Sequence, residues 1–210
     1  MNFRFVLITC AFLMALFICF SGCTGTEGSE NPLISENISV LFSDSVSDQK
    51  AAVENLIKTG EPSVIPLTKV FSKGDQTAST WAAVALRYIG QPSVDPLIEL
   101  LSSGNEYEND WAVNTLASLG TTAVPALIEE AETGNAVSKE SAAIALIKIG
   151  DDAIPLLQFE LNVGDEKYSA DISSIIQSIY ATKKYQDRIS GNSSALKNTS
   201  SDSLAADGSA

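Results

Sequence analysis

The sequence predicts an all-α protein, an α/α superhelical solenoid of about five 30-residue helical hairpins. Two series of glycines predict this fold, because both recur every 30 residues: Gly60, Gly90, Gly120 and Gly150, and Gly74, Gly104, Gly134 and Gly164. Apolar columns keep the same period, among them Leu56, Leu86, Leu116 and Leu146. A period of this length is typical of stacked helical hairpins, in which each unit buries its apolar face against its neighbours.

Each repeat contains the signals of two short helices. From Ala82 to Ile89 the apolar residues return on one helical face, and Gly90 follows as a C-terminal cap. Ser93 then precedes Pro96 by three residues, which predicts a side-chain N-cap followed by a proline in the first helical turn. The second helix is expected to end at Gly104.

Fainter copies of the repeat extend the array at both ends. Ile34 matches Val64 one period later, and Ile176 matches Leu146 one period earlier. We therefore expect a repeat domain over residues 32–181, made of five hairpins with the outer two acting as caps.

The amino terminus has the layout of a signal peptide over residues 1–22. Arg4 precedes an apolar run from Phe5 to Phe20, which is shorter than the roughly 20 residues that a membrane-spanning helix needs. The motif Phe20-Ser21-Gly22-Cys23 resembles the lipobox of bacterial and archaeal lipoproteins. That resemblance implies that Cys23 is lipidated and becomes the first residue of the mature protein.

Several expectations follow from a lipidated Cys23. Residues 23–31 would tether the domain, and the protein would be extracytoplasmic and anchored to the cell membrane. The other two cysteines, Cys10 and Cys19, would leave with the signal peptide, so no disulfide is expected.

Composition excludes several functions. The formal net charge of −13 argues against nucleic-acid binding, which needs clustered Lys and Arg. The chain has no histidine, the commonest general base and a frequent metal ligand. We expect no cofactor, no metal and no catalytic residue.

The candidate partner-binding residues are Trp81, Tyr88, Trp111 and Asn114 on the alanine-rich second helices. The two tryptophans lie one period apart, and rigid aromatic side chains are common anchors for a protein or peptide. Alternatively, both tryptophans fill gaps between adjacent hairpins. The acidic loop at 105–110 has the oxygen ligands of a cation site, but a solvated cluster at a helix N-terminus is the preferred interpretation.

The carboxyl-terminal residues 182–210 lose the period and are rich in Ser and Asn, so we expect them to be disordered. Glycosylation sequons begin at Asn37, Asn192 and Asn198.

Two segments resemble a known family. WAAVALRYIG followed by QPSVDPLIELL, at 81–101, and SAAIALIKIG followed by DDAIPLLQFEL, at 141–161, look like the short HEAT-like repeats first recognised in phycobilisome bilin lyases. The resemblance implies a helical stack, and its members include bilin lyases, scaffolds without chemistry, and hydroxylases that bind iron through His-Glu pairs. The lack of histidine disfavours the hydroxylases, and an export signal disfavours a cytoplasmic lyase.

The sequence therefore predicts a monomeric, non-enzymatic scaffold for an unknown protein or peptide. Two alternatives stay open. One is a lyase-type chromophore-attachment factor or another enzyme of the HEAT-like family, and the other is a structural component of the cell envelope.

Overall fold

The computed structural model describes residues 31–164 and 166–205, with side chains described as far as Ile189. The predicted signal peptide, Cys23 and most of the tether lie outside these residues. From Leu33 onward the chain forms one compact unit. All regular structure in the described residues is helical, and none of their helices is long and apolar enough to cross a membrane.

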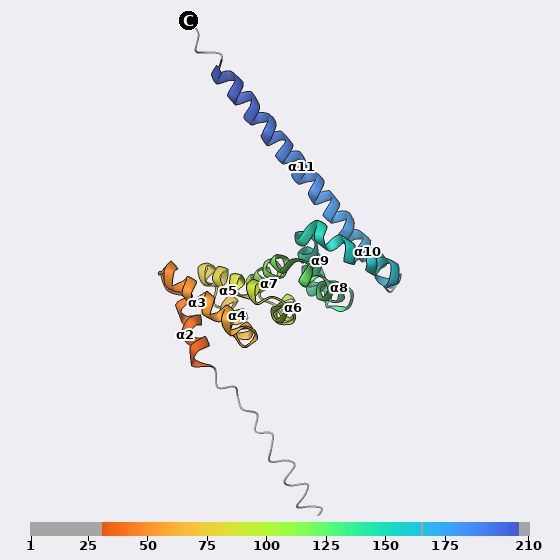
Figure 1. Cartoon of the computed structure of the whole chain (residues 1–210). Helices are drawn as coiled ribbons and strands as arrows, with labels where there is room; N and C mark the ends of the chain where they lie inside the picture. Colours follow the sequence, from red (N-terminus) through yellow and green to blue (C-terminus); the bar gives the residue numbers. More distant parts are fainter. Residues whose placement is uncertain (1–30, 165, 206–210) are drawn as a thin grey trace, which may run out of the picture. The chain divides into compact units, whose positions relative to one another are not determined.

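The helices of the described residues follow one another as five pairs (Figure 1). The pairs are α2 (Pro32–Val40) with α3 (Val46–Thr59), α4 (Val64–Phe71) with α5 (Gln76–Ile89), α6 (Val94–Leu101) with α7 (Glu106–Leu119), α8 (Val124–Thr133) with α9 (Ala136–Ile149), and α10 (Ile154–Val163) with α11 (Ser169–Ala205). Short 3-10 turns such as Gln91–Ser93 connect one pair to the next. The predicted all-α solenoid of five hairpins is confirmed.

The pairs stack in register. Successive second helices contact one another from α3 through α11, and successive first helices do so from α4 through α10. Every repeat adds leucines to one continuous core, and these side chains are almost completely buried: Leu56, Leu67, Leu86, Leu97, Leu116, Leu127, Leu146 and Leu157. Burial of one such side chain contributes about 1.5–3 kcal/mol, so the leucine columns are the main source of stability.

Small residues on the second helices let these helices approach closely. Ala82, Ala112 and Ala142 occupy the same position in three successive repeats and are fully buried. An alanine at this position leaves room for the neighbouring helix, because its side chain extends no further than a methyl group.

The turn between repeats requires glycine. Gly90 has φ +82° and ψ −133°, a backbone conformation that other L-residues rarely adopt. Its N–H donates to the carbonyl of Leu86 at 3.0 Å and its own carbonyl accepts from the N–H of Ser93 at 2.9 Å. Gly60, Gly120 and Gly150 share this conformation, which explains the first glycine series.

The predicted N-cap at Ser93 is wrong. Ser93 has helical backbone angles at the end of a 3-10 turn, and its hydroxyl donates back to the carbonyl of Leu86 at 2.9 Å. A 3-10 turn between Gly90 and the helix has already oriented the chain, so the side chain is free to bond to the preceding helix. The side-chain N-caps instead precede the second helices and also recur every 30 residues: Ser45, Asp75, Asn105 and Asn135.

Disorder over residues 182–210 stays a prediction, and residues 206–210 lie outside the described residues. Helix α11 continues through this segment to Ala205. Residues 181–189 are all exposed, although Lys183 still pairs with Asp151 in the turn before α10. Extending an existing helix costs far less than nucleating one, and the sequence has no proline after Pro155 to stop it.

We predict that Gly90→Ala lowers the free energy of unfolding by about 1–3 kcal/mol, because a β-carbon strains this backbone conformation. Chemical denaturation followed by circular dichroism measures the change. The matched control is Gly104→Ala, since Gly104 belongs to the other glycine series, lies outside the positive-φ region and has open space around it. Equal losses in the two variants would contradict the explanation.

Candidate functional site

Trp81 is tied to the preceding repeat. Its indole Nε1 on α5 donates to Oε1 of Gln49 on α3 at 2.8 Å. The Gln49 amide in turn donates to the carbonyls of Leu41 and Ser43, at 3.0 and 2.6 Å. Gln49 is almost fully buried and Trp81 is half-buried against the core. The Trp81 side chain therefore joins two neighbouring hairpins.

Trp111 makes an analogous contact through its ring. Its indole stacks on Phe71 of α4, with ring centroids 5.7 Å apart and planes 12° apart. Tyr107 approaches its edge at 6.2 Å. Offset aromatic pairs of this kind stabilise packing beyond simple burial. These contacts support the interpretation in which both tryptophans fill space between adjacent hairpins.

A polar contact that recurs between repeats was not predicted from the sequence. Two periods after Gln49, the amide of Asn109 donates to the carbonyl of Leu101 at 2.7 Å, and its Oδ1 accepts from the hydroxyl of Ser141 at 3.0 Å. In both cases the amide nitrogen donates to a backbone carbonyl at the end of the preceding helix, and the amide oxygen accepts from a residue 32 positions later. The signal was a polar residue recurring on an otherwise alanine-rich helix.

The other two predicted binding residues face solvent. The ring of Tyr88 is 68% exposed, and the Arg87 guanidinium lies 5.9 Å from its centroid. Asn114 is exposed as well, and its Oδ1 accepts from Nζ of Lys148 on α9 at 3.0 Å. Ile144, one period after Asn114, is a further exposed apolar residue. We call Tyr88, Asn114, Ile144 and Lys148 the second-helix face.

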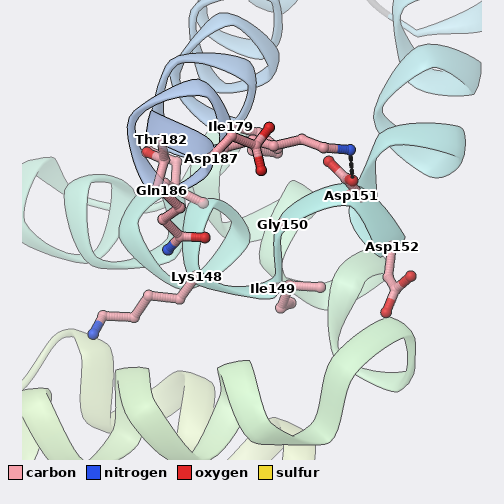
Figure 2. Close-up of a pocket in the computed structure, with 11 residues that line it drawn as sticks. Lys148, Ile149, Gly150, Asp151, Asp152, Ile179, Thr182, Gln186 and Asp187 are labelled. Atoms are coloured by element: carbon pink, nitrogen blue, oxygen red, sulfur yellow. Dashed lines mark hydrogen bonds and ion pairs between the residues drawn. The ribbon is translucent and has the colours of Figure 1, made fainter. Parts of the chain in front are cut away.

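A hollow of about 410 Å³ lies between the end of α9, the turn Gly150–Ala153 and α11 (Figure 2). Lys183 from α11 forms an ion pair with Asp151 across it, and this hydrogen bond raises the pKa of the Lys183 amine. Lys148 also lines the hollow and donates to Asn114. A nucleophilic lysine needs a lowered pKa, so the arrangement around Lys183 disfavours amine chemistry there.

The loop at 105–110 forms the start of α7. The side chain of Asn105 caps the helix by accepting from the N–H of Tyr107, and Glu106 and Glu108 occupy the first turn. Carboxylates in this position stabilise the positive end of the helix dipole. Among the described residues, no group of three His, Cys, Asp or Glu side chains is placed to hold a metal.

The remaining predicted sites have different outcomes. The Asn37 side chain is buried; its amide donates to the carbonyl of Leu33 at 2.7 Å and its Oδ1 accepts from Asn55. Glycosylation at Asn37 stays a prediction, and a glycan on that nitrogen would have to displace these contacts. Asn192 and Asn198 lie within α11, where the side chains are outside the described part, and Cys23 precedes the described residues.

Stacked helical pairs with a solvent-facing surface on the second helices define a helical repeat protein. Residues 80–103 and 138–162 each match the PBS lyase HEAT-like repeat. Each match spans the second helix of one pair and the first helix of the next, across the glycine turn. The chain is therefore a HEAT-like repeat protein of this type. No curated protein matches the sequence significantly.

Single substitutions distinguish an aromatic side chain that packs in the fold from one that faces solvent. We predict that Trp111→Ala lowers the free energy of unfolding by about 2–4 kcal/mol, because it removes the ring that stacks on Phe71 and leaves a gap. Tyr88→Ala should change it by about 0.5 kcal/mol or less, because that ring faces solvent. Denaturation curves of the two variants provide the comparison, and a larger loss for Tyr88→Ala would refute this assignment.

Proposed function

We propose that the protein is a binding scaffold whose second-helix face holds a protein or peptide outside the cell membrane, where a lipidated Cys23 anchors it. The observation that carries the proposal is that three successive second helices each carry an exposed side chain: Asn114 and Ile144 share one repeat position, and Tyr88 lies one helical turn beyond it. Tyr88 comes from α5, Asn114 from α7 and Ile144 from α9.

The stack holds these side chains at a fixed spacing. The axes of packed helices lie about 8–10 Å apart, so Tyr88, Asn114 and Ile144 suit an extended segment that crosses several helices. The hydrogen bond from Trp81 to Gln49 and the one from Ser141 to Asn109 hold neighbouring repeats in register. Preorganisation of this kind reduces the entropy that a partner loses on binding.

The chemistry of the second-helix face favours a particular kind of partner. Tyr88 and Ile144 offer apolar contact, and the Asn114 amide can pair with a peptide backbone. Asp110 and Glu140 are exposed on the same helices, and the chain carries a net charge of −13. A neutral or basic segment with apolar side chains fits this surface best, because charge of opposite sign speeds encounter.

A scaffold is a better interpretation than a lyase. HEAT-like repeats are found with and without chemistry, so the fold does not decide the activity. In the hollow beside α11, Lys183 is held in an ion pair with Asp151, so this side chain gives no support to amine chemistry there.

Site-specific photo-cross-linking tests the binding face. A photoreactive residue in place of Tyr88 should capture a partner in intact membranes in several-fold higher yield than the same residue in place of Glu99, an exposed position on α6. Adding Asn114→Arg to the Tyr88 variant should reduce the yield, because it puts a bulky charge into the contact. Equal labelling from both positions would contradict a specific second-helix face.

The proposed anchor has its own test. Cys23→Ala should release the protein from the membrane pellet, because acyl chains hold a lipoprotein at the bilayer. Mass spectrometry of the amino terminus, with and without the substitution, checks whether cleavage precedes residue 23 and whether acyl chains are attached there. A Cys23→Ala chain that is cleaved and still pellets completely would refute anchoring through this residue.

A further inference from the structure

Helix α10 carries an apolar stripe on its solvent side. The stripe consists of Leu156, Phe159 and Val163, which lie within about 60° of one another around the helix axis at 100° per residue. Phe159 and Val163 are each 62% exposed. Leu157 faces the core instead, and it is the side chain of α10 that the stack buries. The stripe therefore lies outside the contacts that hold the repeats together.

Earlier repeats show that the fold does not require this stripe. The positions equivalent to Phe159 are Lys69, Glu99 and Glu129, and those equivalent to Val163 are Lys73, Ser103 and Thr133. All three residues in the Phe159 column are exposed. Polar residues thus satisfy the fold at these positions, and only α10 replaces them with large apolar side chains.

The next helix contributes a segment that the stack leaves uncovered. Ile172, Ile175, Ile176 and Ile179 define the face of α11 that packs on the stack. The opposite face of its continuation contains Lys184, Tyr185 and Arg188, with Ile189 beside them. Tyr185 is 65% exposed and Ile189 is 53% exposed. We call residues 180–189 the α11 extension.

We propose that the apolar stripe of α10 binds the α11 extension of a second copy of this chain, so that two copies exchange these contacts reciprocally. Tyr185 and Ile189 supply apolar partners for Phe159 and Val163. The extension does not bind its own α10 in this way, because Lys184, Tyr185 and Arg188 lie on the face opposite the isoleucines that hold α11 to its own stack. The proposal replaces the monomer expected from the sequence.

Charge favours a second copy as the occupant. Glu160 lies beside the stripe, and Glu129 on the neighbouring helix α8 occupies the position equivalent to Phe159. The α11 extension carries Lys183, Lys184 and Arg188 against Asp187, in a chain with 26 acidic and 13 basic residues. Lys183 already pairs with Asp151, which leaves Lys184 and Arg188 on the outward face to meet the glutamates.

Two-fold symmetry gives the contact an adequate size. One stripe of three residues against one helix turn falls well below the roughly 1,200 Å² of a stable interface. An isologous dimer forms the same contact twice, because each copy provides both an α10 stripe and an α11 extension. The stripe lies on the first helix of the terminal pair, whereas Tyr88, Asn114 and Ile144 of the second-helix face lie on α5, α7 and α9.

Cysteine cross-linking tests the pairing directly. The natural cysteines lie at positions 10, 19 and 23, so cysteines introduced into the repeat domain report on that domain. Full-length chains with Phe159→Cys and full-length chains with Tyr185→Cys should form a disulfide-linked dimer on mild oxidation when they are co-expressed. Each variant alone should give no more than the wild-type background. Cross-linking of Phe159→Cys with itself would show an α10–α10 contact and overturn the proposal.

Co-isolation of two differently tagged full-length chains from detergent-solubilised membranes gives an independent measurement. Phe159→Glu should reduce co-isolation about tenfold, because it buries a charge next to apolar side chains. This substitution installs the residue that α6 and α8 carry naturally, so the repeat is expected to fold. The matched control, Thr133→Glu, adds the same charge at the position on α8 that corresponds to Val163 and should have no effect.

Complementation distinguishes a reciprocal exchange from other contacts. Lys184→Glu with Arg188→Glu should abolish co-isolation of that variant with itself. Mixing this variant with Phe159→Glu should restore part of the signal, because one of the two exchanged contacts is then intact. Failure of the mixture to recover, or co-isolation of the Phe159→Glu variant at the wild-type level, would overturn the proposal; so would a failure of wild-type copies to co-isolate.

Discussion

A helical hairpin of 30 residues cannot bury its own apolar face, and the rest of this structure depends on that constraint. Each pair gains its core only from the pairs before and after it, as the leucine columns show. The constraint fixes the period, because a residue added or lost within one repeat would turn a buried column towards solvent. It also explains why Gly90 and its equivalents recur with the same backbone angles: each next pair must start in the same orientation.

The fold could be predicted from sequence because the features that specify it are local and repeated. Gly90, Leu86 and Ala82 each recur every 30 residues, so the predicted fold does not depend on any single residue. Capping was harder to predict. Ser93 and Asp75 both have side chains suited to an N-cap. The 3-10 turn after Gly90 gives Ser93 helical backbone angles, whereas Asp75 has an extended backbone and caps α5.

The candidate site was less predictable for a physical reason. The repeat position of Trp81 and Trp111 is the same whether their side chains pack between hairpins or bind a partner. The residues of the preceding repeat decide between these two roles. Gln49 and Phe71 supply those contacts, and they are 32 and 40 positions away in the chain.

The hydrogen bonds between repeats have a consequence for how such an array can evolve. Gln49 on α3 accepts a hydrogen bond from Trp81 on α5, and Asn109 on α7 accepts one from Ser141 on α9. Other polar pairs lie at the remaining boundaries: the hydroxyl of Tyr107 on α7 donates to the hydroxyl of Ser79 on α5, and Lys183 on α11 pairs with Asp151. Each boundary therefore has its own donor and acceptor, so the gain or loss of a repeat would pair donors with groups that belong to another boundary. A change in the number of repeats thus keeps the leucine columns in register but requires new polar pairs where the repeats are joined.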